Sequence, residues 1–149
     1  MTVRKARSSD AIRLAELSEL LGYPVEHGVV RRRIERLLSR PEHLLLVAEL
    51  PESGVTGWIH ATEQEVLEAG CSCEILGLVV AANQRRLGIG RRLVEEVERW
   101  TVERGIRQIS VRSNVVRAES HQFYERLGYA RVKTQHAYRK RIDEHSNDQ

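Results

Sequence analysis

Hydrophobic residues recur along the chain at two spacings, which predict helices and strands in alternation. Strands are expected at residues 2–7, 43–50, 55–62, 73–82 and 106–112, with one or two closing strands within 129–142. Helices are expected at about 8–21, 26–39, 88–104 and 117–127. The element order is therefore β-α-α-β-β-β-α-β-α-β. It predicts an α/β (α+β) fold with one mixed sheet and helices on its faces.

Local signals set the boundaries of these elements. Ser8 or Ser9 can cap the first helix, and Pro41 and Gly105 end the second and third. Residues 63–70 are predicted to form a charged connection. The strand–helix–strand succession over 74–112 predicts a crossover with parallel strands, whereas the hairpin before it is antiparallel.

Composition indicates a single globular domain, predicted at residues 1–142, with a polar tail at 143–149. Hydrophobic residues make up 41% and charged residues 30% of the 149-residue chain. No apolar run approaches the roughly 20 residues of a membrane span, and Met1 to Arg7 begins a strand pattern rather than a signal peptide. We expect a soluble, cytoplasmic protein with no membrane partner.

The charge pattern argues against nucleic-acid binding. The net charge is only +3, and the arginines are scattered rather than gathered with aromatic residues on one face. The run at residues 31–33 is interpreted as a solvated helix face. Cys71 and Cys73 are one residue apart, which suits neither a redox pair nor a zinc site. We expect two reduced, packed thiols and no metal.

The stretch from Glu74 to Leu93 carries the clearest chemical signal. An apolar strand leads through a basic turn into Gly88-Ile89-Gly90, which opens a long amphipathic helix. Such a turn directs several backbone N–H groups at one spot, and the helix dipole favours an anion there. Four arginines surround the turn: Arg85, Arg86, Arg91 and Arg92. These features predict a ligand that bears phosphate.

Two familiar glycine-loop patterns do not fit this turn. A P-loop needs Gly-Lys-Ser/Thr, but Gly90 is followed by two arginines. A dinucleotide fingerprint needs a third glycine where Leu93 stands, and an acidic residue about 20 positions on, where Ser110 and Val111 stand. The pattern left is Arg/Gln-x-x-Gly-x-Gly/Ala, present as Arg85 to Gly90.

With this pattern on this succession of elements, the chain resembles the GNAT superfamily of acetyl-CoA-dependent N-acetyltransferases. A second segment, Ser113 to Tyr129, is similar to the family's later motif, an Asn followed by a helix that ends in Tyr-x-x-x-Gly-Tyr. Arg117 and Ser120 depart from the small or Asn residues common there. The resemblance implies a mostly antiparallel sheet of six or seven strands with about four helices, in which the fourth and fifth strands splay apart.

The resemblance also implies direct transfer of an acetyl group from acetyl-CoA to a primary amine of a small molecule, peptide or protein. The pantetheine arm would run along backbone groups of the fourth strand, and the pyrophosphate would lie at the turn. Implied cofactor-binding residues are Leu78, Val79, Val80, Arg85, Arg86, Leu87, Gly88, Ile89, Gly90, Arg91 and Asn114. From the residues themselves, Gly77 suggests either a bulge or packing beneath a helix.

Two residues are candidates for catalysis. Tyr124 matches the family tyrosine that faces the leaving sulfur, and its phenol could act as general acid. On its own, however, it could equally belong to an apolar helix face with Phe123 and Leu127. Glu74, eleven residues before Arg85, is the candidate general base. Its alternatives are an exposed glutamate at a strand start, or a water relay in its place.

The acceptor is not identified by the sequence. The expected wall residues are Tyr23, Glu26, Trp58, His60 and Glu63 or Glu65, and glutamates there would suit a cationic amine such as a polyamine, aminoglycoside or lysine. His121 is expected to be structural. A different class of function, a non-catalytic acyl-CoA-binding or interaction module, stays open. The terminal strand within 129–142 could also pair across a homodimer.

Overall fold

The computed structural model describes residues 1–84, 87–112 and 118–143. They fall into two compact units, 1–112 and 113–149, each described by itself; the single domain over 1–142 stays a prediction. The strands are β1 (Thr2–Lys5), β2 (His43–Leu50), β3 (Gly54–Val66), β4 (Gly70–Val80) and β5 (Ile109–Val111). The α-helices are α1 (Ala11–Ser18), α2 (His27–Leu38), α3 (Ile89–Glu103) and α4 (Ala118–Arg126). Single 3-10 turns lie at Ser8–Asp10, Glu19–Leu21 and Ala82–Gln84.

The sheet of the first unit follows the order β1-β2-β3-β4-β5. The first three pairings are antiparallel, and β4 pairs with β5 in parallel. The mixed, mostly antiparallel sheet and the parallel crossover are therefore confirmed. The strand count is lower than the predicted six or seven, since the described residues contain five strands.

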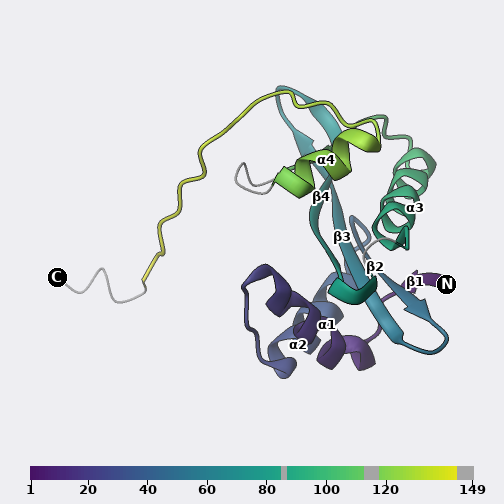
Figure 1. The fold of residues 1–149 in the computed structure, drawn as a ribbon. Helices are drawn as coiled ribbons and strands as arrows, with labels where there is room; N and C mark the ends of the chain where they lie inside the picture. The colour runs from purple at the N-terminus through teal and green to yellow at the C-terminus, as the bar shows by residue number, and fades with distance from the viewer. Residues whose placement is uncertain (85–86, 113–117, 144–149) are drawn as a thin grey trace. The chain divides into compact units, whose positions relative to one another are not determined.

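Helices cover both faces of this sheet (Figure 1). On one face, Val47 and Val79 join a core cluster with Leu14 and Leu17 of α1 and Ile34 of α2. On the other face, buried residues of α3 pack against β2, β3 and β4. Alternate residues of a strand point to opposite faces, so the apolar alternation of β2 and β3 supplies both cores.

The start of α1 differs from the predicted serine cap. Neither Ser8 nor Ser9 caps a helix, and Ser8 Oγ instead donates to Glu35 on α2 at 3.2 Å. Asp10 instead closes the 3-10 turn that precedes α1, because its carboxylate accepts the Arg7 N–H at 2.8 Å and two N–H groups of Arg4 at 2.9 Å. Burial works to raise the pKa of Asp10, but these donors outweigh it and hold the pKa below its usual value.

The predicted connection at residues 63–70 is wrong, because both strands continue into it. β3 runs to Val66 and β4 begins at Gly70, so only a tight turn separates them. β2 begins opposite Thr62, so among the described residues no strand pairs with residues 63–66 on the β2 side. Solvent reaches this end of the hairpin, and polar side chains there obscured the strand pattern. Cys71 in this segment is exposed, so the expectation of two packed thiols holds only for Cys73.

The second unit contains α4 and a long segment after it. Residues 129–142 form no helix or strand, so the predicted closing strands are wrong. Their alternating pattern leaves Val132, Tyr138 and Ile142 80–92% exposed. The physical reason is that alternation fits one face of a strand but does not supply the hydrogen-bonded neighbour that a strand requires.

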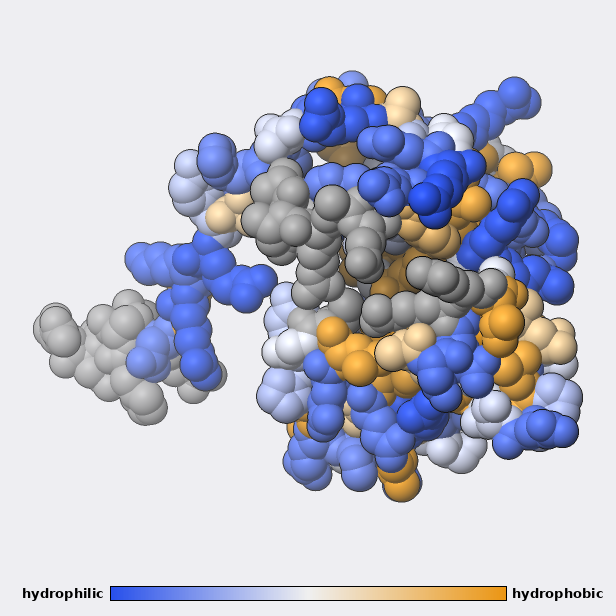
Figure 2. All heavy atoms as spheres, viewed as in Figure 1, coloured by the Kyte–Doolittle hydropathy of each residue, from blue (hydrophilic) through white to orange (hydrophobic). Residues whose placement is uncertain are grey.

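The surface is mainly hydrophilic in the view of Figure 2, with hydrophobic residues in separate patches. No helix in the described part of the chain is long and apolar enough to span a bilayer.

Candidate active site

A bulge in β4 shapes the centre of the site. His60 pairs with Gly77 and Ala61 with Ile75, which leaves Leu76 as the extra residue. A Cβ added to Gly77 would lie 2.7 Å from the Trp58 ring, so only glycine fits beneath the indole. The bulge predicted at Gly77 is confirmed, and the group packed over the glycine is the Trp58 side chain rather than a helix.

β4 and β5 stay together for only three residue pairs. Their register runs from Cys73↔Ile109 to Ile75↔Val111, where β5 ends. Beyond Ile75, residues 77–80 of β4 pair only with β3 among the described residues. Along residues 77–79, the edge of β4 that faces away from β3 has no strand partner in the described part of the chain. The predicted splaying of the two strands stays a prediction, because residues 113–117 lie outside the described residues.

Glu74 lies in the middle of the short ladder between β4 and β5. It is directly opposite Thr62 on β3 and Ser110 on β5, and only 6% of its surface is exposed. Arg112 follows β5 on the same face as Ser110 and forms an ion pair with it, with Nε 3.2 Å from Oε1. The side chain of Arg112 is 81% exposed. The structure thus rules out an exposed glutamate at a strand start.

Two histidines lie beside Glu74 on the same face of the sheet. His43 is in the cross-strand row of Thr62 and Glu74, and His60 is in the next row, opposite Gly77. Their rings stack, with His43 Nδ1 and His60 Nε2 2.9 Å apart. Burial, helped by the neighbouring His43, lowers the pKa of His60 to about 4. His60 is therefore neutral at physiological pH.

We call the surface formed by Trp58, His60, Thr62 and Glu74 the Glu74 face. Two predicted wall residues lie on the opposite face, because Glu63 and Glu65 alternate with Thr62 along β3. Glu63 accepts a hydrogen bond from Arg104 Nε at 2.6 Å, at the end of α3. Glu65 accepts from the Cys71 thiol at 3.4 Å. The expected lining of glutamates around the acceptor is therefore missing at these two positions.

The N-terminus of α3 is the second part of the site. Gly88 adopts a left-handed φ of 75° that favours glycine, and Ile89, only 1% exposed, anchors the first turn on the sheet beside Gly57. The first intrahelical bond runs from Arg92 N to Gly88 O, so the N–H groups of residues 89–91 have no partner within the helix.

The first turn of α3 carries positive rather than the usual negative side chains. The first turn has no acidic residue, although Asp or Glu is favoured there. Arg91 and Arg92 instead stand in it, each paired with a glutamate one turn later, at 2.9 and 3.1 Å. Both pairs are solvent-exposed and therefore weak. Within residues 87–112, no acidic side chain in the first turn of α3 competes with an external anion.

Tyr124 belongs to the second unit. Its ring meets those of Phe123 and Tyr129 edge-on, at 5.0 and 5.8 Å between centroids. Gly128 has φ 92°, which turns the chain so that the Tyr129 N–H donates to the Tyr124 carbonyl at 3.0 Å. Burial raises the pKa of Tyr124 to about 12. The phenol therefore stays protonated at neutral pH, as a general acid must.

Some predicted residues lie outside the described residues, namely Arg85, Arg86 and Asn114. Other residues of the site were missed by the sequence reasoning. Arg112 and His43 meet Glu74 and His60 only through the strand register, which includes a bulge. A spacing along the chain could not have revealed either contact.

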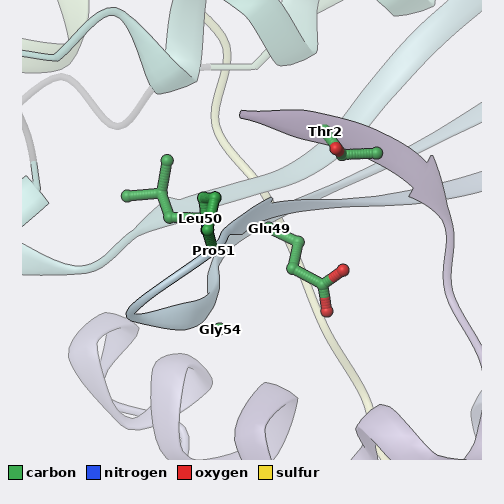
Figure 3. Close-up of a pocket in the computed structure, with 5 residues that line it drawn as sticks. All are labelled: Thr2, Glu49, Leu50, Pro51 and Gly54. Carbon is green, nitrogen blue, oxygen red and sulfur yellow. The ribbon is translucent and has the colours of Figure 1, made fainter.

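A shallow pocket of about 200 Å³ lies elsewhere, at the other end of β2 from His43 (Figure 3). It is lined by Thr2, Glu49, Leu50, Pro51 and Gly54. Glu49 already accepts a hydrogen bond from Arg4 at 3.3 Å. No group of three or more potential metal ligands occurs in the described residues.

Comparison with known proteins gives a consistent family. A model of the acetyltransferase (GNAT) family matches residues 11–129. The acetyl transferase GW6a of Oryza sativa subsp. japonica is 35% identical over 109 residues, which cover 65% of this chain and 26% of that protein. The chain thus spans about a quarter of this relative. An aminoglycoside N(6')-acetyltransferase of Serratia marcescens is 22% identical over 81% of this chain and 84% of its own.

Solved structures share the fold. The apo aminoglycoside 6'-N-acetyltransferase of Acinetobacter haemolyticus has a TM-score of 0.81 at 18% identity, covering 96% of this chain and 100% of its own. A related enzyme in complex with the bisubstrate analogue CoA-S-monomethyl-acetylneamine has a TM-score of 0.81 at 19% identity, covering 95% and 98%.

Proposed function

Because the chain belongs to the acetyltransferase (GNAT) family, we propose that it transfers an acetyl group from acetyl-CoA directly to a primary amine. One observation carries the proposal. A buried carboxylate, Glu74, lies in the β4–β5 ladder, one residue before the last pair of that ladder at Ile75. Bound acetyl-CoA would supply the thioester carbonyl that the amine attacks.

Glu74 is the proton acceptor in this proposal. A simple alkylamine has a pKa near ~10.4 and must lose a proton before it can attack. A carboxylate on the floor of the acceptor site can bind the ammonium and then accept that proton. The neutral His60 beside it adds no positive charge that would repel the ammonium.

The residues proposed to bind acetyl-CoA suit its amide-containing arm and its pyrophosphate. Leu78, Val79 and Val80 lie on the part of β4 proposed to run beside the pantetheine arm, and strand N–H and C=O groups are of the kind that pair with an extended amide chain. The first turn of α3, with Leu87 to Arg91, offers N–H groups and no carboxylate to a pyrophosphate. Arg85, Arg86 and Asn114 complete the proposed set.

Tyr124 is the proposed acid for the leaving thiolate. Because its pKa is raised to about 12, the phenol carries its proton at any pH at which the enzyme works, and it can hydrogen-bond to the leaving sulfur as negative charge develops there. The Gly128 turn and the Tyr129 ring fix the position of this side chain within its unit.

Calorimetry of coenzyme A binding tests the cofactor site. Gly88→Ala forces an L residue into left-handed backbone, and we expect it to weaken binding about 5- to 10-fold by displacing the helix start. Gly105→Ala is the matched control, because Gly105 has the same φ of 75° at the far end of α3. Equal effects of the two variants on affinity, or no binding by the parent protein, would contradict the proposed site.

A further inference from the structure

We propose that the acceptor is a zwitterionic amine, whose ammonium binds Glu74 and whose carboxylate, a few bonds away, binds Arg112. This inference rests on the proposed function and names the substrate class of that site. Arg112 is then a specificity-determining residue. The observation behind it is a pair of opposite charges on the acceptor floor, one buried and one open to solvent.

The charge inventory of the Glu74 face is balanced. Glu74 contributes one negative charge and Arg112 one positive charge, while the adjacent His60 is neutral. A polycation such as an aminoglycoside would meet a guanidinium beside the carboxylate that it needs, which is unfavourable. A zwitterion matches both signs, with each of its charges beside the opposite charge of the protein.

The two β3 glutamates that would have favoured a polycation do not lie on this face. Glu63 is held by Arg104 and Glu65 by Cys71, both on the opposite side of the β3–β4 ladder. A single described carboxylate, Glu74, thus remains on the Glu74 face.

Arg112 has donors available for a second anion. A guanidinium has five N–H groups, and the recorded contact with Glu74 involves Nε. The remaining edge, with two terminal nitrogens, can receive a carboxylate with two parallel hydrogen bonds. Since the side chain is 81% exposed, an incoming carboxylate displaces water rather than protein groups.

The test compares amines that differ only in charge. Acetyl-CoA thiol release is measured with glycine, β-alanine and 4-aminobutyrate, with the carboxamide of each, and with 1,3-diaminopropane. We expect kcat/KM for at least one amino acid to exceed that of its carboxamide by about 10- to 100-fold. Arg112→Gln should remove most of that preference, mainly through KM, and Arg112→Lys should restore part of it.

The change in preference between parent and variant is the decisive quantity, because differences in amine basicity cancel in it. Arg107→Gln is the control, since Arg107 is also exposed, precedes the same strand and loses the same charge. An unchanged preference in Arg112→Gln, or a parent preference for carboxamides or the diamine, overturns the inference while the acetyltransferase proposal stands.

A second measurement covers acceptors that bind without turnover. The thermal stability of the protein with coenzyme A is recorded with each amine, and amino acids should raise Tm more than carboxamides do. If no amino acid is either acetylated or stabilising, the inference is wrong. Binding of coenzyme A in the same samples then shows whether the proposed function fails as well.

Discussion

Two glutamate–arginine pairs lie near each other on opposite faces of the β3–β4 ladder, and they differ in almost every respect. Glu63 and Arg104 are similarly exposed, at 27% and 32%, and Arg104 also stacks on the Trp100 ring at 4.7 Å. The side chain of Glu74 is 9% exposed, whereas that of its partner Arg112 is 81% exposed. Arg104 contacts both Glu63 and Trp100, whereas the described partner of Arg112 is Glu74.

We interpret the Glu63–Arg104 pair as structural and the Glu74–Arg112 pair as part of the proposed acceptor site. The Glu63–Arg104 pair ties the end of α3 to β3, and exchanging it for neutral groups costs only local stability. The buried Glu74 carboxylate depends on a partner that solvent and ligands can reach. An arriving ammonium can take over that role. Substitutions on the two faces should therefore act on different observables.

The largest expected effect is the loss of turnover in Glu74→Gln. Removal of the proton acceptor should lower kcat by roughly 100-fold or more, because general base catalysis typically contributes that much. Thiol release from acetyl-CoA, measured from pH 6 to pH 9.5, checks it. Glu63→Gln is the matched control and should keep its turnover. If the two variants lost activity equally, the contrast between the faces would be wrong.

The next largest effect is expected at Tyr124, the proposed general acid in the second unit. Tyr124→Phe should lower kcat by roughly 10- to 100-fold and leave coenzyme A affinity nearly unchanged, because only the phenolic proton is lost. Tyr138→Phe, at a position 92% exposed, serves as control. Since the pKa of Tyr124 is about 12, its ionisation should cause no loss of rate below pH 10. Unaltered turnover would identify Tyr124 as a packing residue.

A moderate effect on stability is expected from the other face. Arg104→Gln removes the Glu63 pair and the contact with Trp100, and should lower unfolding stability by about 1 kcal/mol, or ~3 °C in Tm. Thermal unfolding measures the change, and kcat should be unaffected. Arg112→Gln should give a smaller shift in Tm. The reverse order would show that Arg112 is the structural arginine.

The smallest expected effect is a dependence of the unfolding free energy on pH that arises from His60. Folded His60 takes up its proton near pH 4, whereas an ordinary histidine does so near 6.5, so the unfolded chain binds more protons between these values. Stability should fall as pH falls from 6.5 toward 4. Chemical denaturation of His60→Gln should show a shallower fall, and the exposed His136→Gln should match the parent. Identical slopes in all three would contradict the burial of His60.

Sequence patterns predicted the parts of the fold that depend on local signals. The helix at 88–104 was predicted to within one residue at each end, because its apolar spacing and its flanking glycines agree. The hairpin extension at 63–70 was missed since solvent on both sides removes the need for alternation. The closing strands in 129–142 were predicted from alternation alone, which does not show whether a neighbouring strand is present to form the hydrogen bonds.

The site shows the same limit. Glu74 and the α3 turn could be predicted because a motif places them on one continuous stretch. Arg112, His43 and the opposite orientation of Glu63 follow from which residue faces which across the ladder. A single unpaired residue, Leu76, changes that assignment.

The bulge at Leu76 also reverses which face of the sheet the side chains of β4 point to. Strand residues take the two faces in turn, so one extra residue exchanges the faces of everything before it relative to everything after it. Glu74 and Gly77 share a face although three positions separate them, and in an unbroken strand they would point in opposite directions. Removal of one residue would therefore move the carboxylate into the core beneath α3. No substitution elsewhere in β4 can produce that change.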